Sequence, residues 1–288
     1  KWWTLGAMSF ALFMIMLDNT VVNVALPSIQ RDLDASLSSL EWTINAYTLT
    51  FAVLLLTGAA LGDRFGRRRM FAIGIGIFTL GSILAALAPD VYFLDAARAI
   101  QGLGGAIVTP LTLTILSAAV PTEKRGLALG AWGGVGGLAI AFGPLVGGAV
   151  VEGISWQWIF WLNVPIGLVL APLALSRLTE TRGPAHSLDL PGVVLGSLGL
   201  LGIVWGLVRG NSAGWSSVEV AATLIAGAVF LLLFVSWELR TAEPMLPMRF
   251  FKNRTFALSN VASLFMFFGM FGAIFLLAQF FQTVQGYS

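Results

Sequence analysis

Two ionisable side chains lie inside long apolar stretches of this sequence. Asp18 falls within "FALFMIMLDNTVVNVALP" (10–27), and Arg98 within "LDAARAIQGLGGAIVTP" (94–110). Each costs about 2.5 to 3.5 kcal/mol at the centre of a bilayer, so both should face a bundle interior or water. Pairing would offset part of that cost, and ionisable groups in such positions are candidates for ion or proton transfer. A structural ion pair that only fixes helix packing is the alternative.

A second charged group lies between two apolar stretches, in "LGDRFGRRRM" (61–70). Gly66 allows a tight turn, and Asp63 stands among four arginines, where it can accept hydrogen bonds or lie against a helix N-terminus. A basic loop that only sets membrane topology is the alternative. That function needs any mixture of Lys and Arg, but it requires neither the Asp nor the Gly.

Glycines recur at a spacing of four in "GAWGGVGGLAIAFGPLVGGAV" (130–150). This spacing places small residues on one helix face and allows close helix approach in a membrane. Pro144 removes one helical hydrogen bond and should bend the helix, so the segment could serve as a gate hinge. A plain packing contact between helices explains the same pattern equally well.

The composition indicates an integral membrane protein. Hydrophobic residues make up 57% and charged residues 10% of the chain, against about 25% charged residues in a soluble domain. The chain has no cysteine and a single histidine, His186, in a polar loop. A chain without cysteine and with one histidine offers little for metal or nucleophilic chemistry. We therefore expect that the protein is not an enzyme and that it binds neither a cofactor nor a metal. No phosphate-binding GxxxxGK[ST] segment suggests ATP as the energy source, and the charge pattern does not suggest nucleic-acid binding.

Nine apolar segments are long enough to cross a bilayer. They run from 3 to 26, 42 to 61, 70 to 88, 92 to 119, 127 to 150, 158 to 177, 190 to 208, 218 to 239 and 256 to 284. With a cytoplasmic N-terminus, every Lys and Arg except Arg31, Arg98 and Arg209 falls on the cytoplasmic side. This asymmetry predicts that orientation.

Five stretches resemble the successive signatures of the major facilitator superfamily, and specifically of its 14-helix drug/proton antiporter branch. They are "LDNTVVNVALP" (17–27), "LGDRFGRRR" (61–69), "RAIQGLGGA" (98–106), "GPLVGG" (143–148) and "WQWIFWLNVPIG" (156–167). The resemblance implies an all-α polytopic membrane protein with nine of fourteen transmembrane helices. Residues 1–178 would form the N-terminal six-helix bundle, residues 179–255 two additional helices and loops, and residues 256–288 the first helix of a C-terminal bundle whose remainder is missing.

The resemblance also assigns roles to particular residues. It makes Asp18 and Arg98 the proton-coupling pair. It assigns a second group of residues to a cytoplasmic latch that biases the protein between its inward and outward states. These residues are Asp63, Arg64, Gly66, Arg67 and Arg68. It matches the antiporter-type motif of the fifth helix to Gly143, Pro144, Gly147 and Gly148. Ala59 and Ala139 replace glycines of the family's pattern, which puts only fine packing in doubt.

The function implied is export of lipophilic drugs or related small molecules, driven by the proton gradient and without a cofactor. Partners would be small lipophilic substrates, protons and the lipid bilayer, with no nucleic acid. The protein would be a monomer when complete, in the cytoplasmic membrane of a bacterium. Two alternatives remain: proton-linked transport of one specific metabolite by the same fold, and a truncated membrane module that does not transport.

Overall fold

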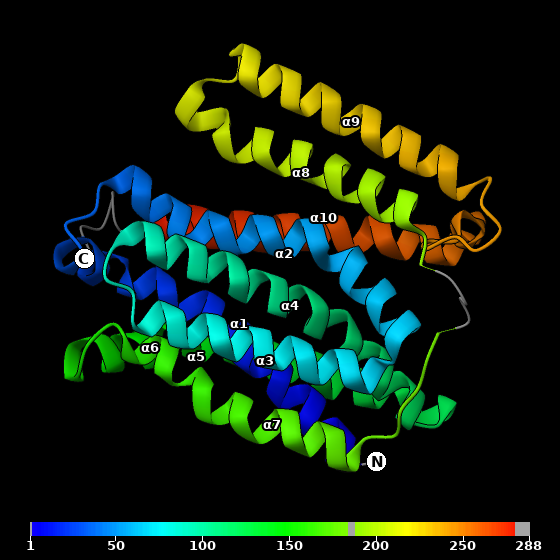
Figure 1. Ribbon diagram of the computed structural model, residues 1–288, viewed down its shortest axis with the longest axis horizontal. Helices are drawn as coiled ribbons and strands as arrows, with labels where there is room; N and C mark the ends of the chain where they lie inside the picture. The colour runs from blue at the N-terminus through cyan, green and yellow to red at the C-terminus, as the bar shows by residue number, and fades with distance from the viewer. Residues whose placement is uncertain (1, 184–187, 280–288) are drawn as a thin grey trace.

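The computed structural model describes residues 2–183 and 188–279, and this part of the chain is helical and contains no strand (Figure 1). The helices are α1 (Trp2–Asp32), α2 (Leu37–Phe65), α3 (Arg67–Ala86), α4 (Val91–Ala119), η1 (Thr122–Lys124), α5 (Arg125–Gly153), α6 (Trp158–Trp161), α7 (Asn163–Arg177), α8 (Leu190–Ala213), α9 (Val218–Glu238), η2 (Met248–Lys252) and α10 (Arg254–Gln279). The predicted polar-loop residue His186 lies outside the described residues.

The predicted spans match the helices closely. In the described part, 8 spans are long and apolar enough to cross a membrane, and they correspond to the first eight predicted segments. The sixth segment comprises α6 and α7, which meet at Leu162. The ninth lies on α10 as far as the structure describes it. The first helix runs beyond its predicted end at 26, and Asp32 in its last turn accepts a 2.7 Å hydrogen bond from Trp156 Nε1.

Helices α1 to α7 form a bundle in which α4 packs against both α2 and α3, α1 packs against α5, and α3 packs against α7. Gly58 shows how close these contacts are. A Cβ at this position of α2 would lie 2.8 Å from Cα of Ile107 on α4. Only glycine allows the two backbones to approach this closely, as expected where packing in lipid depends on small residues.

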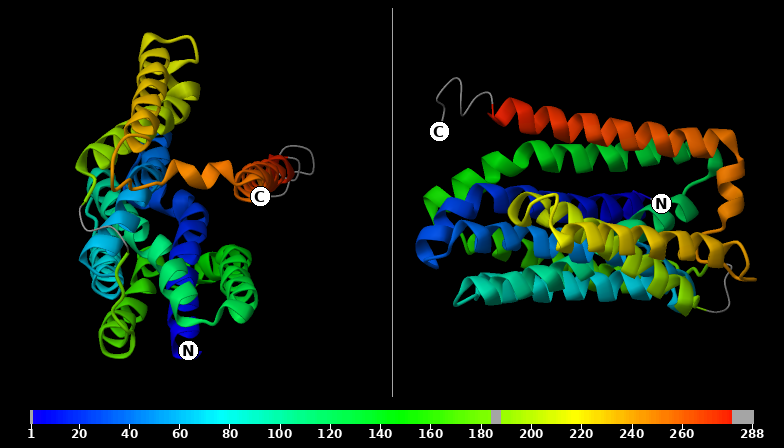
Figure 2. Two further views of the ribbon diagram at one scale, coloured as in Figure 1. Left: turned by 90° about the vertical axis from the view of Figure 1, so that its right-hand side faces the viewer. Right: turned by 90° about the horizontal axis from the view of Figure 1, so that it is seen from above.

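Helices α8 and α9 form a hairpin that projects from the bundle (Figure 2). Gly202 and Gly227 lie back to back in the hairpin, since a Cβ on Gly202 would be 2.7 Å from Cα of Gly227. The hairpin attaches to the bundle through α8 and α2. The rings of Trp42 and Trp205 there lie 5.3 Å apart between centroids.

The bundle core consists of two apolar clusters that follow each other along the helices. On α1, buried residues from Ala7 to Ile15 belong to one cluster, and those from Leu17 to Ile29 belong to the other. The same division recurs on α3, α4 and the α6–α7 segment. A layer of buried polar side chains lies where the two clusters meet.

Candidate functional site

The polar layer brings together side chains from five helices at one depth of the bundle. Each of them is at most 1% exposed. They are Asp18 of α1, Thr43 of α2, Ser82 of α3, Arg98 and Gln101 of α4, and Asn163 at the start of α7. Apolar side chains cover this layer on both sides, so its charges must be satisfied within it.

Asp18 and Arg98, the two ionisable residues predicted to lie inside the bundle, contact each other directly. Arg98 Nη1 donates to Asp18 Oδ2 at 2.6 Å. Arg98 Nε donates to the carbonyl oxygen of Thr43 at 3.2 Å, and its guanidinium carbon lies 4.4 Å from the centroid of the Tyr47 ring. The buried cation therefore has a carboxylate, a carbonyl and an aromatic face as partners, which offset its desolvation.

Two amide side chains hold the other oxygen of Asp18. Asn163 Nδ2 donates to Asp18 Oδ1 at 2.7 Å, and Gln101 Nε2 donates to the same atom at 3.1 Å. Both amides also reach Ser82 Oγ, at 3.1 and 2.6 Å. Gln101 Oε1 in turn accepts from Arg98 at 2.8 Å. All side-chain partners of the carboxyl group are donors, an arrangement that suits a negatively charged carboxylate.

The sequence analysis did not single out Gln101, Asn163 or Ser82. Gln101 and Asn163 do carry a signal, because an amide inside an apolar span must find a partner in the bundle. Both fall within stretches that carry the family resemblance, "RAIQGLGGA" and "WQWIFWLNVPIG". Ser82 carries no such signal, since a serine can satisfy its hydroxyl group on its own helix.

A second acid is linked to the layer through Thr43. Thr43 Oγ1 donates to Asp95 Oδ1 at 2.8 Å, while the carbonyl of the same threonine accepts from Arg98. Asp95 is half-buried and lies one turn before Arg98 on α4. The hydrogen bonds thus run from Asp18 through Arg98 and Thr43 to a partly exposed carboxyl group.

The predicted latch lies at the junction of α2 and α3. Gly66 forms this junction with φ +106°, a backbone conformation that other residues rarely adopt. Asp63 Oδ1 accepts from Arg67 Nε at 2.8 Å across the turn. Arg64 is exposed, and Arg68 points toward the segment that follows α7.

Glu180, which the sequence analysis missed, completes this junction. Its carboxylate accepts from the backbone N–H groups of Arg68, at 2.9 Å, and Arg69, at 3.3 Å, at the start of α3. It also lies 3.7 Å from Arg68 Nε. The N–H of Arg67 donates to Thr181 O at 2.9 Å. An anion at a helix N-terminus satisfies free N–H groups and interacts favourably with the helix dipole, so Glu180 caps α3.

The glycines of the α5 motif divide into two faces. A Cβ on Gly143 would collide with Thr20 of α1, and one on Gly147 would lie 3.2 Å from Val24 Cβ. Gly148 has open space around its Cα. Helix α5 continues through Pro144 to Gly153. Gly143 and Gly147 therefore bring α5 and α1 together, immediately beyond Asp18.

No group of three or more His, Cys, Asp or Glu side chains that could hold a metal ion occurs in the ranges 2–183 and 188–279. The polar layer offers a carboxylate, a guanidinium, two amides and two hydroxyl groups. The carboxylate can bind and release a proton, while the other groups form hydrogen bonds with polar atoms.

Comparison with known proteins supports this architecture. The chain is 38% identical over 287 residues to multidrug resistance protein Stp of Mycobacterium tuberculosis, covering 99% of this chain and 53% of that protein. It is 36% identical over 289 residues to the tetracenomycin C resistance and export protein of Streptomyces glaucescens, covering 100% of this chain and 54% of that protein. The chain thus spans about half the length of the curated relatives it matches.

The fold also resembles solved transporters. A crystal structure of the peptide transporter POT in complex with sulfate aligns with a TM-score of 0.60 and 16% sequence identity, over 83% of this chain and 53% of that one. Residues 8–288 match the sequence family described as the Major Facilitator Superfamily. The chain is a multi-pass membrane protein and belongs to the major facilitator superfamily of transporters.

Proposed function

We propose that this chain is part of a proton-coupled antiporter that exports lipophilic drugs or related small molecules. The observation that carries the proposal is the buried contact between Asp18 and Arg98, with two amides on the second carboxylate oxygen. Relatives named for multidrug resistance and for antibiotic resistance and export favour this class of substrate.

Coupling follows from the cost of breaking the pair. When Asp18 takes up a proton, it no longer offsets the charge of Arg98, and an unpaired buried charge costs about 3 to 5 kcal/mol. The bundle then gains by rearranging so that Arg98 reaches water or another partner. A nearby cation lowers the proton affinity of a buried carboxylate, so a cationic substrate entering this layer and a proton on Asp18 exclude each other.

Alternating access requires one bundle to rock against the other. We assign residues 1–178 to the N-terminal bundle, 179–255 to two additional helices and 256–288 to the start of the C-terminal bundle. The junction around Gly66 serves as the latch that favours one state, through Asp63, Arg64, Arg67 and Arg68, now joined by Glu180. Within the α5 motif, Gly143 and Gly147 hold α5 against α1, and Pro144 and Gly148 lie on the face on which the bundles move.

The driving force is adequate for export. Moving one elementary charge through 100 mV gains about 2.3 kcal/mol, which sustains a roughly 45-fold gradient of a neutral substrate. We place the protein in the cytoplasmic membrane of a bacterium, with a cytoplasmic N-terminus, in accordance with the distribution of Lys and Arg. It works as a monomer, and its partners are lipophilic substrates, protons and the lipid bilayer.

The test uses everted membrane vesicles that contain the complete transporter to which this chain belongs. Under an imposed pH gradient, addition of a lipophilic substrate should release protons from the vesicle lumen. A panel of chemically unrelated substrates separates multidrug export from transport of one metabolite. Absence of proton release with every substrate would refute the proposal.

A further inference from the structure

Two carboxyl groups meet at the base of the α8–α9 hairpin, far along the chain from Asp18. Asp189 precedes α8, and its Oδ1 accepts from the N–H of Gly192 at 3.0 Å and from Trp237 Nε1 at 2.8 Å. Glu238 is the last residue of α9, is 3% exposed, and its Oε2 accepts from the N–H of Leu246 at 2.8 Å.

The second oxygen of each carboxyl group is buried, and within 2–183 and 188–279 it has no hydrogen-bond donor. These atoms are Asp189 Oδ2 and Glu238 Oε1. Both lie against Gly192, where an added Cβ would collide with the first and be 2.8 Å from the second. The two oxygens therefore lie close to each other, on the same side of Gly192. Two buried oxygen acceptors thus lie close together, and no described residue donates a hydrogen bond to either of them.

Two carboxylates that share a site cannot both ionise without strong repulsion, and such a pair retains one proton. The proton belongs to the pair and not to either residue. We propose that Asp189 and Glu238 form a proton-binding site in which the two carboxyl groups hold one proton between Asp189 Oδ2 and Glu238 Oε1. This site is separate from the Asp18 layer, and the inference does not depend on the transport proposal.

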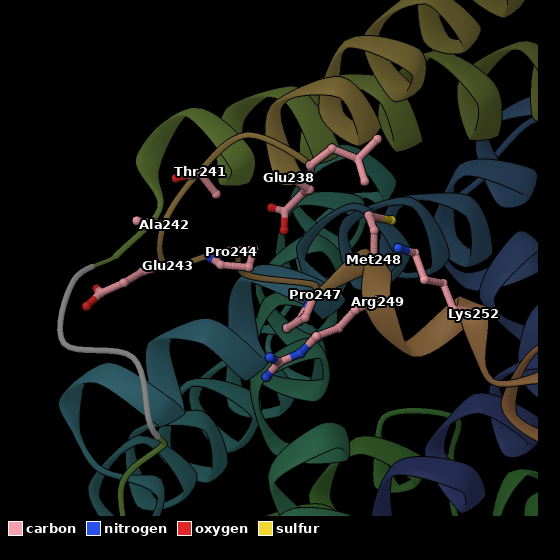
Figure 3. A pocket seen from close by; sticks show the side chains of 10 residues that line it. Glu238, Thr241, Ala242, Glu243, Pro244, Pro247, Met248, Arg249 and Lys252 are labelled. Carbon is pink, nitrogen blue, oxygen red and sulfur yellow. The ribbon is translucent and has the colours of Figure 1, made fainter.

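The charged groups around the pair do not replace that proton. Glu238 borders a cavity of about 420 Å³ whose lining includes Arg249 and Lys252 of η2 and Glu243 of the preceding loop. Figure 3 shows the carboxylate of Glu238 directed toward Pro244, with the charged ends of the other three side chains set apart from it. Arg240 follows α9 and is exposed. Among the residues that the structure describes, none of these cations forms an ion pair with Glu238 or Asp189.

The position of the pair gives the proton a structural effect. Asp189 caps the start of α8, and Glu238 ends α9 and binds the backbone at Leu246, in the segment that leads through η2 to α10. Loss of the proton would leave two buried negative charges in contact. We therefore expect the base of the hairpin to open in alkaline solution and to close again on acidification.

The test is a pH titration of this chain in lipid nanodiscs, followed by the infrared band of protonated carboxyl groups. The wild type should show a component of this band that disappears reversibly as the pH rises. Glu238→Gln and Asp189→Asn should each lack that component, because the amide supplies the hydrogen. Asn is also a good N-cap, so Asp189→Asn should keep α8 capped. The matched control, Glu123→Gln at an exposed acid, should retain it.

If the infrared bands overlap, the pH dependence of thermal unfolding provides a second test. The midpoint of thermal unfolding should fall from acidic to alkaline pH more strongly in the wild type than in Glu238→Gln. The inference is overturned if Glu238→Gln retains the titrating band component, or if both proteins show the same pH dependence of unfolding. It is also overturned if Mg²⁺ or Ca²⁺ stabilises the wild type but not Glu238→Gln, since the pair would then be a cation site.

Discussion

Arg98 Nη1 lies 2.6 Å from Asp18 Oδ2, although the two residues are 80 positions apart in the chain. Both side chains are inaccessible to solvent and lie between two apolar clusters of the bundle. Such a pair is poor evidence for stability, because two charges lose their hydration when they are buried. Apolar residues of similar size would not incur this cost in free energy. We propose instead that the pair is kept because transport requires the charge of Asp18 to change.

The first prediction concerns the energy of this pair. Arg98→Met leaves the charge of Asp18 buried without its cation, and should lower the free energy of unfolding by about 3 to 5 kcal/mol. The double variant Asp18→Leu with Arg98→Met removes both charges and should be destabilised less than the sum of the single variants. A double-mutant cycle of denaturant unfolding in detergent measures this coupling. Additive effects would contradict the pairing.

The second prediction concerns the amide of Asn163. Asn163→Leu removes a 2.7 Å hydrogen bond to Asp18, and should cost about 1 to 3 kcal/mol of stability because a buried acceptor loses a donor. Denaturant unfolding in detergent measures this loss. Asn23→Leu, at an exposed position of α1, is the control and should leave the free energy of unfolding nearly unchanged.

Much of this arrangement could be predicted from the sequence. Runs of apolar residues located the spans, and the cost of a charge in the bilayer pointed to Asp18 and Arg98. What could not be predicted was the set of polar partners. Asn163 meets Asp18 because α7 packs against α3 and α1, and such long-range geometry leaves no pattern in one sequence. An apolar span shows only that an amide needs a partner, not which partner it finds.

The third prediction concerns Glu180, which lies in a polar loop with no periodic pattern. Glu180→Gln keeps the shape of the cap but removes its charge beside Arg68 and Arg69. We expect a loss of about 0.5 to 2 kcal/mol, the range of helix N-caps. Because partly exposed charges are screened by salt, the loss should shrink as salt is added. Glu152→Gln, at an exposed acid of α5, is the control; an equal loss there would argue against capping by Glu180.

The fourth prediction separates the two faces of α5. Gly143→Ala inserts a methyl group against Thr20 and should cost about 1 to 3 kcal/mol through overpacking. Gly148→Ala faces open space and should change stability by no more than about 1 kcal/mol, with a gain expected from helix propensity. Thr20→Ala should rescue Gly143→Ala. Thermal unfolding of the four variants measures these effects, and equal responses of the two glycines would contradict the α1–α5 contact.

The most direct test of the central claim is proton-coupled transport by Asp18→Asn in the complete transporter. In everted vesicles with an imposed pH gradient, this variant should be present and folded in the membrane, yet release no protons on addition of substrate. Asp34→Asn, at an exposed acid beyond the end of α1, should behave as the wild type. Proton release at the wild-type level from Asp18→Asn would contradict the account and leave the Asp18–Arg98 pair with a structural role alone.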